Sequence, residues 1–452
     1  MPNRSLSLFD ATMLVMGGIV GVGIFFTPAD VARAVDSEAA YLGLWLAGGL
    51  AALSGAMTFA ELSAAYPRTG GWYVWLSEAF GRRIAFLFAW TVLLVVSTGA
   101  CALVARFFAE QALSLFGGSA GGAGVSLVAG GAIVFVTGLG VLGLKSGALF
   151  QNACMALKLM AIGTFVLTGL GLVAGAPEHA AVAQTAADAA PDGSGFGGLF
   201  GASLAVLFSY GGWQLIGYVA PSVSNPQRNL PRAIVVGVAG VLAIYLVLNI
   251  AYLRVLGLEG LARSDGPPMA VRMANATLGD AAGVTFVHAA MAVSALGFLV
   301  ATLITTPGIY VAMAREGLFV PALGRTHATT GAPVPALLTQ CAFALGYLAW
   351  SHGDSAFVQS LQGAVVFAEW IFHGLAGAAL IVLVRRAGTE RPFKSPLFPL
   401  FPALYAALAV LVVVGNLWTQ LGSDEPEVVL IGVLVVALGA LAYPVLMRRA
   451  VR

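Results

Sequence analysis

The sequence predicts an all-α membrane protein with twelve transmembrane helices. Three observations lead to this prediction. First, 59% of the 452 residues are hydrophobic and only 9% are charged, whereas about a quarter of the residues are charged in a typical soluble domain. Second, apolar runs of about 20 residues, the length that a helix needs to cross a bilayer, recur along the whole chain. Third, two of these runs contain glycine clusters near their middle.

The predicted spans alternate with short polar loops, the longest of which is external and covers residues 176–196. The first span is not a signal peptide, because it is too long, is interrupted by glycines and precedes eleven further spans. The twelve spans are Leu8 to Val35, Tyr41 to Ala65, Ile84 to Leu113, Gly124 to Leu144, Gly147 to Gly175, Gly197 to Ala220, Ala233 to Leu256, Ala281 to Ala314, Pro335 to Trp350, Ala356 to Val384, Phe401 to Trp418 and Val428 to Leu446.

The distribution of basic residues predicts the orientation of the spans. Lys and Arg are retained in the short loops on the cytoplasmic side of a membrane. With both termini placed in the cytoplasm, sixteen of the 22 basic residues fall on the inside. The exceptions are Arg33, Arg254, Arg263 and Arg272 in external loops, and Arg106 and Lys158 within spans. Because the basic residues form no single patch and the net charge is only +2, we expect no nucleic-acid partner.

Several functional classes lack their usual residues. No GxxxxGK[ST] motif is present, so a transport process would depend on gradients rather than on ATP. The five His are scattered, which argues against a membrane-embedded enzyme, a metal site or another cofactor. The three cysteines, Cys101, Cys154 and Cys341, all lie in apolar spans, so we expect them to be packing residues rather than an external disulfide.

Glycine clusters interrupt the first and the sixth span. They are GGIVGVGIF, from Gly17 to Phe25, and FSYGGW, from Phe208 to Trp213. Each glycine costs about 1 kcal/mol relative to alanine in a helix, so both helices can break there. A break is tolerated in hydrocarbon only where it faces a cavity or a solute. Close packing of ordinary helices is the alternative explanation for either cluster alone.

The positions of the two breaks predict an inverted repeat of five spans. Paired broken helices in two halves indicate a substrate site at the middle of the membrane, and such a site argues against a continuous channel pore. The first unit covers residues 1–175, the second covers residues 197–384, and residues 401–452 add two peripheral helices and a cytoplasmic tail.

The backbone at the two breaks can bind the two ends of a zwitterion. At the first break, the N–H groups around Gly21, Val22 and Gly23 begin the second half-helix, where the helix dipole favours a carboxylate. At the sixth span, the carbonyl groups of residues 208–210 end a half-helix and carry the partial charge that suits an ammonium group. An amino acid carries both groups.

Four stretches resemble the amino acid–polyamine–organocation superfamily, whose members share the leucine-transporter (LeuT) fold, and in particular its L-type amino-acid transporter branch. They are GGIVGVGIFFTP from Gly17, AAYPRTGGWYVWL from Ala64, FSYGGW with SNPQRNLPRAI from Ser224, and AREGLFVPAL from Ala314. The resemblance implies substrate binding by Val20, Gly21, Val22, Gly23, Phe208, Ser209, Tyr210 and Gly211. The chain departs from the pattern at Val22, where many relatives have Ser or Ala, at Ser222, where Glu is common, and at Val300 and Ala301, which replace an Asn–Gly pair.

Lys158 is an ionisable residue near the middle of the fifth span, and such a residue is a functional candidate. By the resemblance, it occupies the place of sodium in sodium-coupled relatives and links helix five to the first broken helix; we favour this role. The alternatives are a proton carrier, because burial lowers the pKa of an amine, and a purely structural cation that pairs with carbonyls of helix one.

Other candidates are aromatic or ionisable. Phe208, Tyr210 and Trp213 flank the second break and are candidate gates, although ordinary packing explains Trp213 equally well. Glu369 and His373 lie on one helix face, and we interpret them as a buried hydrogen-bonded pair rather than a proton relay. Glu61 and the pair Arg106 and Glu110 are interpreted as interfacial anchors or helix pairs, and no partner is predicted for His288.

These patterns, together with the resemblance, predict a secondary transporter, exchanger or permease, for small neutral amino acids, and the resemblance implies that it is sodium-independent and works by alternating access. Neutral substrates are favoured because neither break contains a charged residue. The alternatives are a proton-coupled amino-acid symporter and an amine or polyamine carrier. The Ala- and Gly-rich composition fits a bacterial inner membrane. No external cysteine is available for the glycoprotein heavy chain that animal relatives bind, so we expect no such partner.

Overall fold

The computed structural model describes residues 5–117, 122–173, 196–351, 355–386, 391–421 and 427–450. Within these ranges the regular structure is helical, and the only β-type pairing is an isolated parallel bridge between Leu6 and Val223. The all-α prediction is therefore confirmed for the described residues. The predicted external loop falls almost entirely outside them.

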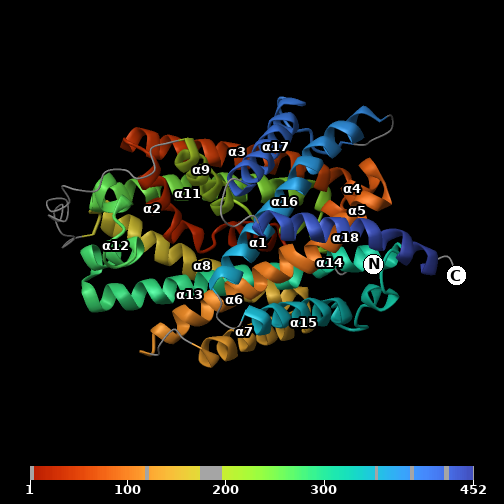
Figure 1. The fold of residues 1–452 in the computed structure, drawn as a ribbon, viewed down its shortest axis with the longest axis horizontal. Helices are drawn as coiled ribbons and strands as arrows, with labels where there is room; N and C mark the ends of the chain where they lie inside the picture. Colours follow the sequence, from red (N-terminus) through yellow and green to blue (C-terminus); the bar gives the residue numbers. More distant parts are fainter. Residues whose placement is uncertain are drawn as a thin grey trace.

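The helices form an elongated bundle in which most axes run roughly along the long axis of the molecule (Figure 1). The α-helices are α1 (Leu8–Ile19), α2 (Thr27–Ala34), α3 (Glu38–Ala65), α4 (Trp72–Phe80), α5 (Arg82–Thr91), α6 (Ser97–Ser114), α7 (Ala123–Val141), α8 (Leu144–Gly169), α9 (Phe196–Ser209), α10 (Leu215–Tyr218), α11 (Pro226–Ala262), α12 (Met269–Leu278), α13 (Asp280–Thr305), α14 (Pro307–Arg315), α15 (Val334–Ser351), α16 (Ser355–Arg385), α17 (Leu400–Leu421) and α18 (Glu427–Ala450).

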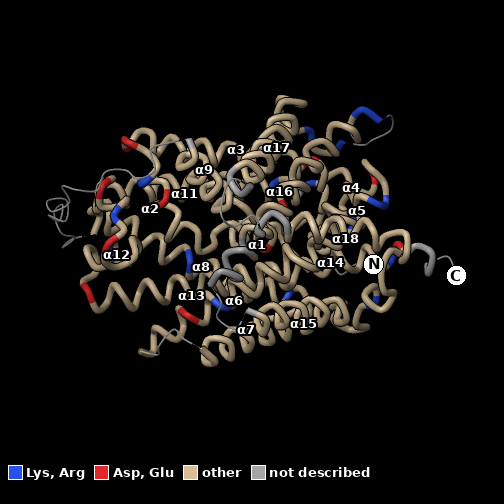
Figure 2. The backbone as a smooth tube through the Cα atoms, in the orientation of Figure 1, with Lys and Arg blue, Asp and Glu red and all other residues tan. Residues whose placement is uncertain are grey.

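Eight described helical segments are long and apolar enough to cross a membrane. Four shorter apolar helices coincide with the remaining predicted spans: Leu8–Ile19, Gly197–Ser209, Val334–Trp350 and Ile431–Leu446. The first and the second of them are short because each stops at a glycine cluster. Acidic and basic residues gather mainly toward the two ends of the bundle (Figure 2). The apolar helices thus support a multi-pass membrane protein.

The helix boundaries differ from the prediction at three places. The short helices α4 and α12 were not predicted, because nine or ten residues are too few to cross a bilayer. Helix α11 has 37 residues and is longer than the predicted span Ala233 to Leu256. It begins at Pro226, where proline is favoured at the first helical position, and its backbone leaves the helical conformation at Gly257.

Helix α1 lies in the middle of the bundle, where it packs against α8, α11 and α13 (Figure 1). Its N-terminus is held by Asp10, which accepts hydrogen bonds from Ser7 N–H, Lys145 Nζ at 2.6 Å and Asn152 Nδ2 at 2.8 Å. The segment before α1 is also tied to the segment after α10, because Leu6 N–H donates to Ser222 O at 3.0 Å. Both broken regions are therefore anchored at this end.

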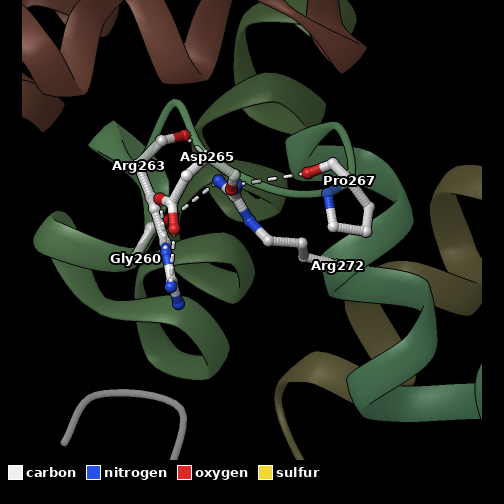
Figure 3. A network of polar contacts seen from close by, with 5 residues as sticks. All are labelled: Gly260, Arg263, Asp265, Pro267 and Arg272. Atoms are coloured by element: carbon white, nitrogen blue, oxygen red, sulfur yellow. Dashed lines mark hydrogen bonds and ion pairs between the residues drawn. The ribbon is translucent and has the colours of Figure 1, made fainter. Parts of the chain in front are cut away.

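Arg272 organises the connection between α11 and α12 (Figure 3). Its guanidinium donates to the carbonyl oxygens of Gly260, Arg263 and Pro267 at 2.8, 3.1 and 3.2 Å. Arg263 also forms a two-pronged ion pair with Asp265 at 2.6 and 2.7 Å, and this guanidinium holds the pKa of the exposed Asp265 carboxyl below its ordinary value. Hydrogen bonds from the Arg272 guanidinium to backbone carbonyls thus hold the loop in place.

Glycines in the loop before α4 allow the end of α10 to approach closely. Gly70 N–H donates to Tyr218 O at 3.0 Å. Gly71 has a positive φ of 40°, and a Cβ built on it would lie 2.4 Å from the carbonyl oxygen of Gly217. A Cβ on Gly308 of α14 would lie 2.4 Å from Tyr218 O. The end of α10 therefore packs closely against three glycines, which we call the glycine socket.

We predict that Gly71→Ala destabilises the protein, because a positive φ costs an L-residue roughly 1–2 kcal/mol and the added methyl group also meets Gly217. The matched control is Gly43→Ala, in α3, where a Cβ meets nothing within 4 Å. Thermal unfolding in detergent should show a lower melting temperature for Gly71→Ala and an equal or higher one for Gly43→Ala. Equal melting temperatures for the two variants would contradict the glycine socket.

Candidate functional site between two interrupted helices

Both glycine clusters lie where helical structure is interrupted. Helix α1 ends at Ile19, a single 3-10 turn covers Gly23–Phe25, and α2 begins at Thr27. In the other half, α9 ends at Ser209 and α10 begins at Leu215. We call the two gaps the first break (residues 20–22) and the second break (residues 210–214).

The two broken helices touch through their glycines. Gly212 has a φ of 120°, and a Cβ built on it would lie 2.1 Å from the carbonyl oxygen of Gly18. In the reverse direction, a Cβ on Gly18 would lie 2.8 Å from Gly212 O. Only glycine satisfies both the backbone conformation and the spacing at position 212. Two segments almost 200 residues apart in the sequence are thus in direct contact.

The first break presents backbone donors. The N–H group of Gly21 is used within the break, where it donates to Ile19 O at 2.7 Å. The N–H groups of Val22 and Gly23 donate to no residue that the structure describes, and both residues are partly exposed. They directly precede and begin the 3-10 turn, a place where unpaired N–H groups favour an anion. Two of the three predicted donors are therefore available.

The second break presents a backbone acceptor. Phe208 O accepts from Gly211 N–H at 3.0 Å, and Ser209 O accepts from the Tyr245 hydroxyl at 3.2 Å. The carbonyl oxygen of Tyr210 accepts from no described residue. Among the predicted carbonyls, Tyr210 O therefore keeps its full capacity to accept a hydrogen bond.

Ser209 joins the second break to the beginning of α2. Its hydroxyl lies 2.9 Å from Thr27 Oγ1, and a Cβ built on Gly23 would lie 2.7 Å from it. The side chain is 4% exposed. Ser209 is thus a packing contact between the breaks, and Gly23 leaves room for it.

Tyr245 of α11 bridges the two breaks and was not predicted from the sequence. Its hydroxyl lies 3.3 Å from Ile19 O and 3.2 Å from Ser209 O, the last residues of α1 and α9. The side chain is fully buried. The available signal was a tyrosine in an apolar span, because a buried tyrosine hydroxyl usually has a hydrogen-bond partner.

Lys158 lies at the carboxyl end of α1. Its ammonium donates to Val20 O at 2.6 Å and to Gly17 O at 3.1 Å, and the residue is only 2% exposed. A Cβ on Gly297 of α13 would lie 2.8 Å from Nζ, so glycine makes room for the lysine. A cation at this end of a helix is favoured by the dipole. The side chain therefore links α8 to the first broken helix.

The three candidate gates differ in exposure. Phe208 keeps 48% of its surface exposed. The ring of Tyr210 is fully buried against Trp45 and Tyr245, and that of Trp213 packs against His373 and Tyr405. In this conformation, Tyr210 and Trp213 are packed into the helix bundle, and Phe208 is the candidate with a free ring.

Glu369 and His373 do not form the predicted hydrogen bond. Their side chains are neighbours on α16, but the distance from His373 Nε2 to Glu369 Oε1 is 3.8 Å. Each has a different hydrogen-bond partner: Gln214 Nε2 donates to Glu369 Oε1 at 2.9 Å, and His373 Nδ1 pairs with the Tyr405 hydroxyl. The four-residue spacing placed both residues on one face, but side chains from other helices supply their partners.

The remaining polar candidates each have a partner in the structure. Arg106 Nε lies 3.0 Å from Glu110 Oε1, as predicted for a helix pair. Glu61 is not an interfacial anchor, because it is fully buried, pairs with Arg391 and accepts from Ser395 N–H at 2.9 Å. His288 Nδ1 lies 2.8 Å from Gln111 Oε1. The described residues contain no cluster that could hold a metal ion.

Comparison with known proteins identifies similar chains. Residues 6–438 match the family described as amino acid permease. The chain is 31% identical over 412 residues to the b(0,+)-type amino acid transporter 1 of Mus musculus, covering 90% of this chain and 82% of that protein. It is 31% identical to the serine/threonine exchanger SteT of Bacillus subtilis, covering 92% of both chains. It is 28% identical to the large neutral amino acids transporter small subunit 2 of Oryctolagus cuniculus, covering 97% and 80%.

We predict that Tyr245→Phe lowers thermal stability, because it leaves the buried carbonyl of Ser209 without its described donor, whereas Ile19 O keeps the hydrogen bond from Gly21 N–H. An unsatisfied buried group costs about 1–3 kcal/mol. Tyr443→Phe is the control, since Tyr443 lies in α18 and its ring packs against Phe86, outside both breaks. Thermal unfolding in detergent should separate the two variants, and an unchanged melting temperature for Tyr245→Phe would show that the bridge contributes nothing.

Proposed function

We infer the function from the family. The chain belongs to the amino acid permease family and to the L-type branch of the amino acid–polyamine–organocation superfamily. We propose that it is a sodium-independent secondary transporter of small neutral amino acids. It exchanges or carries them across the inner membrane by alternating access. The observation that carries this proposal is the contact between the two breaks. In this proposal, the N–H groups of Val22 and Gly23 and the carbonyl oxygen of Tyr210, which have no partner among the described residues, belong to one binding site.

This arrangement suits a substrate that carries both a carboxylate and an ammonium group. The N–H groups would bind the carboxylate, and the carbonyl oxygen would accept a hydrogen bond from the ammonium. An amine or polyamine has no carboxylate for the first break. The geometry therefore favours an amino acid over the amine alternative.

Small and neutral substrates are supported by the residues around the breaks. No charged side chain belongs to the predicted binding residues 20–23 and 208–211. The valine side chain at position 22 is larger than the Ser or Ala that many relatives have there, and in this proposal it narrows the site. A similar chain, SteT, is named for serine and threonine, whereas another is named for large neutral amino acids. We propose the smaller class for this chain.

Sodium independence is proposed from the position of Lys158. A fixed positive charge with its Nζ 2.6 Å from Val20 O and 3.1 Å from Gly17 O already satisfies the carbonyls that a sodium ion would need. The two charges would repel each other at this distance. We therefore assign Lys158 the role of a built-in cation that stabilises the end of α1.

The proposed architecture is the LeuT type, with twelve transmembrane helices and an inverted repeat of five. The interrupted helices α1/α2 and α9/α10 support it, because they begin the proposed units at residues 1–175 and 197–384. Residues 401–452 would form the peripheral helices, with both termini in the cytoplasm. Cys101, Cys154 and Cys341 are free and buried, so we propose that no heavy chain is attached through a disulfide.

The function is tested by uptake of radiolabelled amino acids into proteoliposomes. We expect uptake of small neutral amino acids such as serine, threonine and alanine, with no stimulation by a sodium gradient. Stimulation by internal amino acid would identify an exchanger, and stimulation by a pH gradient would identify the proton-coupled alternative. Uptake of amines without amino acids would contradict the proposal.

We predict that Lys158→Ala abolishes or severely impairs uptake, because the carbonyls of Gly17 and Val20 lose their donor and the end of α1 loses its cation. The control Lys394→Ala removes an exposed lysine and should retain wild-type rates. Uptake at the wild-type rate by Lys158→Ala would refute the proposed role of this residue.

A further inference from the structure

A hydrogen-bonded chain connects the second break to α16. It begins at the backbone N–H of Gly212, which donates to the side-chain oxygen of Gln214 at 3.0 Å. The side-chain nitrogen of Gln214 then donates to Glu369 Oε1 at 2.9 Å. An acidic residue from a helix outside both breaks is thus two hydrogen bonds away from the glycine at which the broken helices cross.

The orientation of the Gln214 amide is fixed by this chain. The oxygen and nitrogen of an amide are alike in shape, but a backbone N–H can only donate, so the oxygen of Gln214 must face Gly212. Its nitrogen must then face α16 and needs an acceptor there. Gln214 is 7% exposed, so water is not a ready substitute. Glu369 supplies the acceptor that the geometry requires.

His373, which shares α16 with Glu369, does not form a hydrogen bond with the Glu369 carboxylate. His373, one turn further along α16, has its Nε2 3.8 Å from Glu369 Oε1, beyond hydrogen-bond distance. The His373 ring is held instead by the Tyr405 hydroxyl and packs against Trp72 and Trp370. Gln214 is therefore the hydrogen-bond partner of Glu369 among the described residues.

We propose that Glu369 is a positioning residue for substrate binding: it orients Gln214, which holds the Gly212 N–H and so fixes the second break against the first. This inference rests on the proposed amino-acid transport, and it names a residue outside both breaks that sets affinity. A hydrogen-bond acceptor is required at position 369, whereas a negative charge is not. The side-chain oxygen of Gln in Glu369→Gln can accept from Gln214, but no such atom exists in Glu369→Ala.

The test compares the kinetics of amino-acid uptake for matched variants. We expect Glu369→Ala to raise the KM about tenfold, the effect of one lost hydrogen bond in a buried site, with a smaller change in maximal rate. Glu369→Gln should stay within about threefold of the wild type, which is under 1 kcal/mol. His373→Gln, which leaves the chain intact, is the control and should also stay close to the wild type.

A double variant tests whether Glu369 and Gln214 act through the same hydrogen-bonded chain or affect binding independently. Gln214→Ala should raise the KM as Glu369→Ala does, and the two changes together should cost little more than either alone, because both break one chain. Gln214→Ala also provides the test if Glu369→Ala fails to fold. A KM for Glu369→Gln as high as that of Glu369→Ala, an unchanged KM for Glu369→Ala, or fully additive effects would each overturn the proposal.

A second readout does not depend on transport. Hydrogen–deuterium exchange of peptides covering residues 208–214 should be faster in Glu369→Ala than in the wild type, and Glu369→Gln should restore slow exchange. If the wild type takes up no amino acid, the proposed function fails, while the exchange comparison still tests the link. Equal exchange in all variants would overturn the positioning role itself.

Discussion

The structure depends on satisfying backbone groups where two apolar helices are interrupted within the helix bundle. An unpaired N–H or C=O group in a bilayer costs several kcal/mol, so a broken transmembrane helix needs partners from its surroundings. Here two neighbouring helices and one residue of the second break supply them. Lys158 of α8 binds the end of α1, Tyr245 of α11 binds the ends of both α1 and α9, and Gln214 binds Gly212.

The groups that these side chains do not satisfy define the proposed site. Val22 N–H, Gly23 N–H and Tyr210 O have no partner among the described residues, and they lie at the interrupted helices that cross at Gly18 and Gly212. By contrast, the carbonyls of Gly17, Val20 and Ser209 and the N–H group of Gly212 are bound by side chains. The supporting side chains thus leave free the donors and the acceptor that an amino acid would bind.

The interruptions and their chemistry were predictable from the sequence, because glycine weakens a helix at its own position and does not depend on distant contacts. The clusters at Gly17 and Gly212 weaken a helix wherever it lies, and a lysine in the middle of an apolar span is visible without a structure. The supporting contacts were not predictable, because they join residues far apart in the chain: Gln214 is 155 residues from Glu369, and Tyr245 is 226 residues from Ile19. The four-residue spacing of Glu369 and His373 likewise suggested that they form a hydrogen bond with each other, but their hydrogen-bond partners are Gln214 and Tyr405.

The most direct test of this account is a cryo-EM structure of the protein with a bound small neutral amino acid. The account predicts the substrate carboxylate within hydrogen-bond distance of Val22 N–H and Gly23 N–H, and its ammonium within that distance of Tyr210 O. A substrate bound away from both breaks, or one held through charged side chains instead of these backbone groups, would contradict it.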